Sequence, residues 1–294
     1  MIKIGTRGNE LARKQANSLS HSLNQKEIKH SITIYDGDDD LQTATSDNPD
    51  IIPPSVEVLR KALLKGEIDL AIHPLTMLPA EAMSNVVIAG LSDRTDPSDL
   101  LLIHKKAYAE SKAFKLKDEA VIGTSSKRRK ALLTHFREDI QIRDLHGTME
   151  EQIEALRQNK YDGIIVAKAD VELLGTDITG LEPLTLNPRE FIPAPGQGVV
   201  AYQTRADDID LRKEVARWTN RKLVRMINVE RKIQKLTKGT IGAFCETDAL
   251  GHFHVWTCLI DADKNHLNFV QYSSSTIHQL AETIVKKLNN DIDI

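Results

Sequence analysis

Residues 121–133 read Val-Ile-Gly-Thr-Ser-Ser-Lys-Arg-Arg-Lys-Ala-Leu-Leu. This order predicts a short strand, a turn and a helix capped by Ser125 or Ser126, because a serine hydroxyl accepts a hydrogen bond from an unpaired N–H group of the first helical turn. The first turn then carries the cations Lys127 to Arg129, although the helix dipole disfavours positive charge there. Helix N–H groups, hydroxyls and cations at the end of a strand favour binding of a carboxylate or phosphate. A serine-capped helix with a solvated basic first turn fits the same stretch.

The length and charge of the chain exclude several classes of protein. Its 294 residues are enough for two or three domains, and a formal net charge of −3 gives no overall attraction to nucleic acid. There is no run of about 18 apolar residues, and the N-terminal sequence enters a strand pattern directly. We therefore expect a cytoplasmic monomer with neither a nucleic-acid nor a membrane partner.

No metal site or disulfide framework is predicted. The two cysteines, Cys245 and Cys258, are expected to be small buried apolar side chains. The acidic run Asp36 to Asp40 suggests a calcium loop, but Leu41 stands where such a loop needs glycine.

Strand patterns alternate with helical patterns through the first two hundred residues. This alternation predicts an α/β fold with mainly parallel sheets and ligands at the carboxyl ends of the strands. The predicted strands are 2–7, 31–35, 68–73, 100–104, 120–123, 140–144, 162–166 and 199–204, and the predicted helices include 127–136, 148–158 and a short one ending at Leu174.

Two proline-containing breaks, at 93–97 and 191–198, predict two crossings between domains. Two α/β units joined by two crossings resemble a type II periplasmic binding protein, whose ligand lies between hinged domains. After residue 207 the pattern changes to a long helical stretch, three strands near 240–248, 253–260 and 266–272, and a final helix capped by Thr276. The predicted domains are 1–95 with 198–206 (α/β), 96–197 (α/β, with the anion site) and 207–294 (α+β, with an antiparallel sheet).

Taken together, short motifs along the chain resemble the porphobilinogen deaminase, or hydroxymethylbilane synthase, family. The matches are Gly5-Thr6-Arg7, Leu11-Ala12, Gln15-Ala16, Gly66 to Asp69, His73 with Leu75 and Pro79, Arg94 with Asp96-Pro97, Gly123 to Ser126 with Arg128-Arg129, Tyr161-Asp162, Pro193-Ala194 with Gly196 to Gly198, and Ile241 to Ala243. The resemblance implies a transferase of tetrapyrrole and haem biosynthesis. In that family a third-domain cysteine holds a dipyrromethane primer, and four porphobilinogen units are joined to it. A carboxylate stabilises the cationic intermediate, and arginines bind the acetate and propionate groups.

The departures from the family pattern fall on this chemistry. Met77 stands at the position of the catalytic aspartate, and His146 and Gln152 stand at two anion-binding arginines. The segment 235–240 lacks the family's cysteine, while Cys245 lies beyond it inside a predicted strand. We therefore expect no dipyrromethane cofactor in this chain.

Three functional hypotheses remain open. The chain makes hydroxymethylbilane by the usual route, binds a small carboxylated or pyrrolic ligand without that catalysis, or runs different chemistry with His73 or His146 as acid or base. For His73 a structural hydrogen bond is the simpler expectation. The predicted substrate- or anion-binding residues are Arg7, Thr124, Ser125, Ser126, Lys127, Arg128, Arg129, His146, Gln152 and Gln197.

Overall fold

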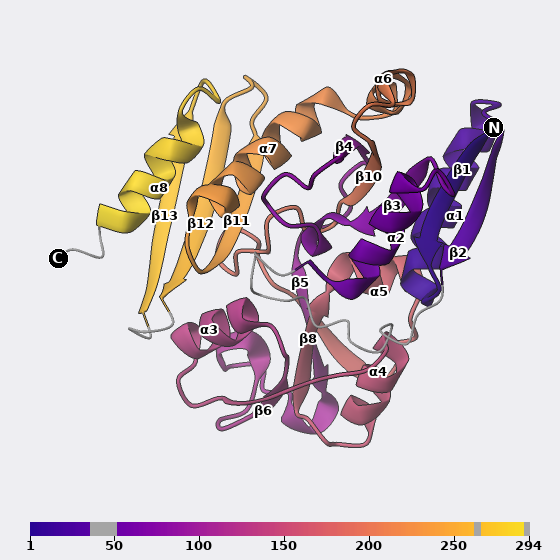
Figure 1. Ribbon diagram of the computed structural model, residues 1–294. Helices are drawn as coiled ribbons and strands as arrows, with labels where there is room; N and C mark the ends of the chain where they lie inside the picture. Colours follow the sequence, from indigo (N-terminus) through magenta and orange to yellow (C-terminus); the bar gives the residue numbers. More distant parts are fainter. Residues whose placement is uncertain (36–51, 262–265, 291–294) are drawn as a thin grey trace.

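The computed structural model describes residues 1–35, 52–261 and 266–290. The acidic run Asp36 to Asp40 lies outside these residues. Within them the chain forms three sheets, each covered by helices (Figure 1).

The first sheet has the strand order β2-β1-β3-β10-β4. Helix α1 packs on β1 and β3, and α2 packs on the same strands and on β10 and β4. The apolar faces of α1 and α2 enter two separate cores, which include Leu19 and Leu23 of α1 and Leu59 and Leu63 of α2. The elements are β1 (Ile2–Arg7), α1 (Glu10–Gln25), β2 (His30–Tyr35), α2 (Pro54–Leu64), β3 (Leu70–Pro74), β4 (Val86–Leu91) and β10 (Val200–Arg205).

The second sheet repeats this pattern in the order β7-β6-β8-β5-β9. The helix predicted at 127–136 is confirmed with the same ends. Ser126 caps its start, and the backbone departs from helical geometry at Arg137. The elements are β5 (Asp99–His104), β6 (Val121–Gly123), α3 (Lys127–Phe136), β7 (Gln141–Arg143), α4 (Met149–Arg157), β8 (Gly163–Ala167), α5 (Lys168–Leu174) and β9 (Leu181–Thr185).

The expectation of mainly parallel sheets holds for the direction of four of the five strands in each sheet, but one strand in each is reversed. In the first sheet β1 pairs in parallel with β2 and β3, but β10 pairs antiparallel with both β3 and β4. In the second, β5 pairs antiparallel with both β8 and β9. The reversed strand in each sheet directly follows a crossing, so the chain enters the sheet from its opposite end.

The third part of the chain packs two helices on a three-stranded antiparallel sheet (Figure 1). The long helical stretch divides at residues 218–220 into α6 (Ile209–Arg217) and α7 (Arg221–Leu236), and Asn220 caps α7. The sheet is β11 (Thr240–Thr247), β12 (Phe253–Asp261) and β13 (His266–Ser274). The predicted start of the last helix is wrong: α8 is Leu280–Asn290, while Thr276 forms a turn in which its hydroxyl accepts from the His278 N–H.

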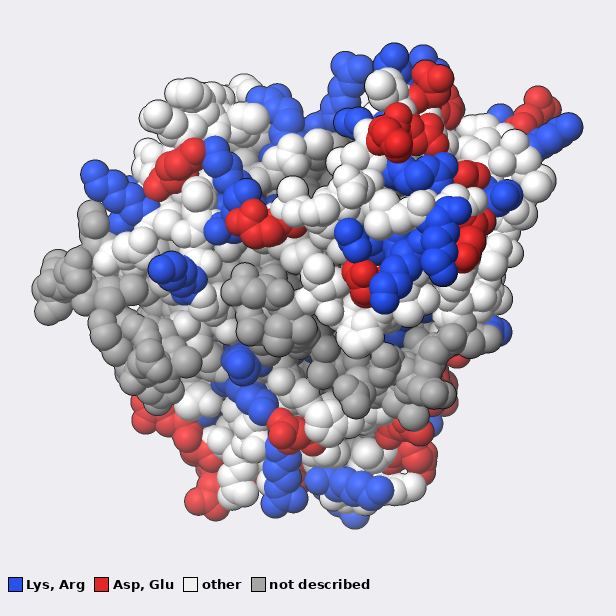
Figure 2. Space-filling model, in the orientation of Figure 1, with Lys and Arg blue, Asp and Glu red and all other residues white. Residues whose placement is uncertain are grey.

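The fold is thus α/β, with two domains of the type II periplasmic binding protein kind and a third domain with an antiparallel sheet. Basic and acidic side chains intermingle on the face drawn in Figure 2, in keeping with the small net charge. In the described ranges no helix is long and apolar enough to cross a membrane. The same residues contain no cluster of three or more potential metal ligands from His, Cys, Asp and Glu.

Candidate functional site

The start of α3 is built as the sequence predicts. Strand β6 ends at Gly123, and the Ser126 hydroxyl accepts from the Arg129 N–H at 3.4 Å, which makes Ser126 the N-cap. The Thr124 hydroxyl accepts from the Ser126 N–H and so fixes the turn. Three consecutive cations therefore do stand in the first turn of this helix.

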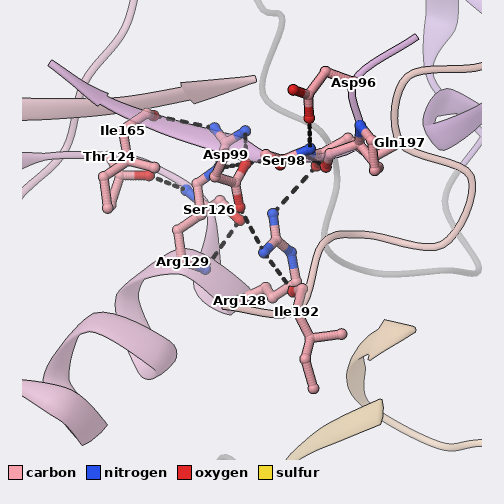
Figure 3. A network of polar contacts seen from close by, with 11 residues as sticks. Asp96, Ser98, Asp99, Thr124, Ser126, Arg128, Arg129, Ile165, Ile192 and Gln197 are labelled. Carbon is pink, nitrogen blue, oxygen red and sulfur yellow. Dashed lines mark hydrogen bonds and ion pairs between the residues drawn. The ribbon is translucent and has the colours of Figure 1, made fainter. Parts of the chain in front are cut away.

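The two arginines of this turn already bind a carboxylate of the chain itself, that of Asp99 at the start of β5 (Figure 3). Arg128 Nη1 lies 2.9 Å from Asp99 Oδ2, and Arg129 Nη2 lies 2.8 Å from Asp99 Oδ1. Asp99 is fully buried and Arg128 is 3% exposed. The predicted anion-binding arginines therefore have an internal counter-ion, and their contact with a ligand stays a prediction.

The electrostatics of this cluster favour an ionised Asp99. Burial alone would raise its pKa, but the charges of Arg128 and Arg129 outweigh that effect and hold the pKa below its usual value. Two guanidinium groups face the one carboxylate of Asp99. Such buried ion pairs tolerate loss of one partner poorly, because the other charge is then left without compensation.

A second carboxyl group, Asp170 in the first turn of α5, stands near this cluster. Burial raises its pKa to about 6, and the charge of Asp99 adds to the rise while that of Arg129 opposes it. Helix α5 packs on α1 of the first domain, where the Lys14 ammonium donates to the Leu174 carbonyl. Asp170 therefore belongs to the region where the first two domains meet, and it changes charge near neutral pH.

Gln197 joins the two crossings to the same cluster. Its side-chain nitrogen donates to the Pro97 carbonyl at 2.8 Å and to Asp99 Oδ1 at 3.0 Å, and its side-chain oxygen accepts from Arg128. The flanking Gly196 and Gly198 have φ of 77° and 78°, and a Cβ on Gly196 would lie 2.6 Å from Leu75 Cδ2. The hinge-like segment needs glycine at this position for both reasons.

The remaining predicted residues of the second domain are spread around this cluster. The Ser125 hydroxyl donates to the Leu145 carbonyl at 2.6 Å and accepts from the Leu145 N–H, so it ties two loops together. Gln152 donates to the Gly147 carbonyl at 2.9 Å. His146 and Lys127 are exposed, and Lys127 has interactions within the chain.

The first domain contributes Arg7, His73 and Met77 from the carboxyl ends of β1 and β3. Arg7 is 5% exposed, and its Nη1 lies 3.5 Å from the Met77 sulfur, among other interactions that it makes. Met77 closes the short 3-10 turn, Leu75–Met77, that follows β3. A neutral thioether thus lies against Arg7 at the position where the resemblance implies a catalytic aspartate.

The expected structural hydrogen bond of His73 is wrong. His73 is fully buried, and neither of its ring nitrogens has a hydrogen-bond partner among the described residues. Burial, aided by the charge of Arg7, lowers its pKa to about 3. His73 is therefore neutral at physiological pH, so it is not available there as an imidazolium acid.

Both cysteines are buried, as predicted. Cys245 faces the core between the third sheet and its helices, while Cys258 joins the core shared with the second domain. Burial raises the pKa of both thiols, to about 11 for Cys258 and further for Cys245. Neither sulfur is a reactive thiolate at neutral pH.

Sequence reasoning missed three carboxylates that organise this region: Asp99, Asp170 and Glu230. Glu230 on α7 is fully buried, binds Arg94 at 2.7 Å, and accepts from the N–H groups of Gly196 and Cys245. It therefore connects both crossings to the third domain. An aspartate at the head of the apolar run Asp99-Leu-Leu-Leu was a usable signal, since a charge buried in a strand needs a partner. Asp170 and Glu230 lie in ordinary amphipathic helices and carried no such signal.

Comparison with known proteins gives one consistent family. The family model described as "Porphobilinogen deaminase, dipyromethane cofactor binding domain" matches residues 2–213. A porphobilinogen deaminase of Syntrophomonas wolfei is 36% identical over 224 residues, which are 74% of this chain and 70% of that protein. The porphobilinogen deaminase of Fusobacterium nucleatum is 33% identical over 249 residues, 81% of this chain and 79% of that protein. The match covers 53% of a probable porphobilinogen deaminase of Ignicoccus hospitalis, which is 36% identical over 167 residues, or 56% of this chain.

Among solved structures, the GluR0 ligand-binding core in complex with L-glutamate is similar over 78% of this chain and 95% of that chain. The sequence identity is 12% and the TM-score is 0.44.

The expectation of no cofactor is contradicted by the family match, because the matched domain is described as one that binds the dipyrromethane cofactor. The expectation rested on the missing cysteine, which concerns only the covalent attachment. The two cysteines present do not fit that attachment, since both are buried and both have raised thiol pKa values. The chain therefore matches the cofactor-binding domain, but neither of its two cysteines suits the covalent attachment.

Proposed function

Because the chain belongs to the porphobilinogen deaminase family, we propose that it binds a carboxylated pyrrole compound of the dipyrromethane class, held without a covalent bond, between its first two domains. We propose further that it does not run the family's standard primed polymerisation. The observation that carries this proposal is Met77, whose sulfur lies 3.5 Å from Arg7 Nη1 where the family resemblance places a catalytic carboxylate.

The chemistry of Met77 supports the loss of the standard reaction. A thioether neither carries charge nor moves a proton, so it cannot stabilise the cation that forms as ammonia leaves. Removing a group that stabilises a transition-state charge typically costs a hundredfold or more in rate. His73, two residues from the turn that bears Met77, cannot replace the carboxylate because a neutral imidazole holds no negative charge.

The thiols support a non-covalent ligand. Attachment through a cysteine needs an accessible sulfur with thiolate character, and burial denies both properties to Cys245 and Cys258. Moving Cys245 into reach would also break the hydrogen bond from its N–H to Glu230, which is 2.8 Å long.

The charges support a carboxylated ligand. Arg7 on the first domain and Arg128 and Arg129 on the second lie on the two domains that the crossings join. Burial makes each charge-assisted hydrogen bond to a carboxylate stronger than it would be in water.

The test combines intact mass with Ehrlich's reagent, which colours dipyrromethanes. We expect the bare sequence mass under denaturing conditions, together with binding of free porphobilinogen or a dipyrromethane dicarboxylate by calorimetry. The variant Met77→Asp alone is expected to form no hydroxymethylbilane, and Met77→Leu serves as its control. A mass increase of two pyrrole units on either cysteine would sink the non-covalent proposal, and turnover by the unmodified chain would sink the loss of polymerisation.

A second candidate is a different proton-transfer reaction in the same place, and Asp170 favours it. A carboxyl group with a pKa of about 6 is both acid and base near neutral pH. If the chain turns over a pyrrole substrate, Asp170→Asn should abolish the turnover but leave ligand affinity within about twofold.

A further inference from the structure

A cavity of about 740 Å³ lies outside the region just described, between the edge strand β4 and helices α6 and α7. Its lining is mixed, and the apolar surface open to a ligand comes from the exposed Ile88 and the half-buried Ala89 and Val224. A cavity of this volume is in the range that proteins use to bury small organic ligands.

The other lining residues give this cavity a strongly positive character. Four of them are cations, Lys213, Arg217, Arg221 and Arg231, and none is an acid. Of the four, Arg217 pairs with Glu214 at 3.0 Å on an exposed surface, where such a pair contributes little. A local excess of positive charge in a chain of net charge −3 is a specific feature of this cavity.

Arg231 is the half-buried member of the set, while the other three cations are exposed. Its guanidinium group donates to the carbonyls of Leu78 and Pro79, and the described residues give it no carboxylate partner. Desolvation lowers its pKa to about 10, in keeping with a guanidinium group that has only carbonyl partners. An anion in the cavity would provide that compensation.

We propose that this cavity binds an amphipathic organic anion, with an apolar body and at least two acidic groups. A small inorganic anion would leave the apolar surface exposed to water, and a neutral apolar molecule would bury Arg231 further without a counter-ion. An apolar body against Ile88 and Val224, with acidic groups towards Arg221 and Arg231, satisfies both. The proposal does not depend on which ligand the interdomain region takes.

The cavity touches the same turn that carries Met77, from its other side. Leu75 lines the cavity and its N–H donates to the Val199 carbonyl at 2.9 Å, while Arg231 binds the carbonyls just after Met77. A bound anion would therefore contact the segment 75–79 through Arg231 and restrict it.

The test is fluorescence titration of the full chain with bis-ANS, an apolar dianion, in parallel with the neutral N-phenylnaphthylamine. We expect bis-ANS to bind at least tenfold more tightly than the neutral probe, with the same affinity when porphobilinogen is present in excess. Arg231→Met and Arg221→Gln should each weaken it about tenfold, since a hydrogen bond to a charged group contributes about that much. Lys222→Gln is the matched control, because Lys222 adjoins Arg221 on α7 but does not line the cavity; its affinity should not change.

Ala216→Trp provides a second variant that keeps every charge. Ala216 lines the cavity from the exposed face of α6, so a large side chain there should fill the space and abolish binding without unfolding the domain. Equal affinity for the two probes, an equal loss in Lys222→Gln, or full binding by Ala216→Trp would each overturn the proposal.

Discussion

The residues that the second domain contributes between the domains differ sharply from those of the first. In the second domain Asp99, Arg128, Arg129 and Gln197 bind one another, and Asp99 alone has contacts with the other three. In the first domain His73 is equally buried but has no hydrogen-bond partner in the part of the chain that the structure describes, and Arg7 faces a thioether among its other contacts. The second domain thus pairs its buried polar groups with one another, while the two ring nitrogens of His73 in the first domain have no such partner among the described residues.

This difference shows that residue type alone does not define a binding site. The two arginines in the first turn of α3 bind the carboxylate of Asp99, which belongs to the chain itself. Burial then decides the consequences, because a buried charge without a partner is costly on either side.

The largest expected effect follows from breaking the second-domain cluster. Asp99→Asn removes the counter-ion of two arginines, one of them buried, and should lower the free energy of unfolding by about 3–5 kcal/mol. Chemical denaturation measures it. Glu81→Gln, which removes the partner of Lys235 in an exposed pair 2.8 Å long, should change stability by no more than about 0.5 kcal/mol. A loss in Asp99→Asn as small as in this control would show that the cluster is solvated rather than buried.

Much of the fold could be predicted because its signals are local. The helix at Lys127–Phe136 was predicted to the residue, since the capping serine marks its start and the apolar residues Ala131 to Leu133 follow in its second turn. Strands β4 and β9 were not predicted. Both lie at sheet edges, and Pro183 interrupts the pattern of β9 in a way that only an edge strand tolerates. The reversed direction of β5 and β10 was also missed, because the residues of a strand do not indicate from which end it enters the sheet.

The site was predictable only as a set of positions. The family resemblance located Arg7, Met77 and the start of α3, and the structure adds their partners. That Asp99 faces Arg128 depends on the pairing of β5 with β8 and on the placing of α3, although the two residues are 29 positions apart in the sequence. Long-range contacts of this kind have no local signal in a single sequence.

The next effect concerns Asp170 and is seen as a pH dependence. Its pKa is about 6 in the folded chain against 3.8 for the ordinary carboxyl group, so between these values the folded state binds more protons than the unfolded state. Stability from this group is therefore present below about pH 4 and lost as pH rises towards 6. Asp170→Asn should remove that decline and raise stability at pH 7 by on the order of 2 kcal/mol. If stability between pH 4 and 7 is the same in the original chain and in Asp170→Asn, the Asp170 carboxyl group is exposed to solvent.

A smaller effect should distinguish the first domain from the second. His73→Leu replaces two unsatisfied ring nitrogens with an apolar side chain, so stability should rise by about 1–2 kcal/mol instead of falling. If those nitrogens contact the ligand, calorimetry should show that porphobilinogen binding weakens in the same variant. Gln197→Leu is the matched contrast in the second domain, where every side-chain hydrogen bond is satisfied and the same kind of change should destabilise. A destabilised His73→Leu protein would mean that the two sides are alike.

The smallest effect compares the helix caps of the two domains. Asn9 Oδ1 accepts from the Ala12 N–H at 2.8 Å, whereas Ser126 Oγ accepts from the Arg129 N–H at 3.4 Å. Because the shorter bond satisfies its donor better, Asn9→Ala should cost about 1 kcal/mol and Ser126→Ala about 0.5 kcal/mol in thermal or chemical unfolding. Two features of α3 should also reduce the loss in Ser126→Ala. The cations of its first turn already oppose the helix dipole, and the contacts of Arg128 and Arg129 with Asp99 hold the helix more than its cap does. The reverse order of the two losses would mean that the cap, and not Asp99, fixes the position of these arginines.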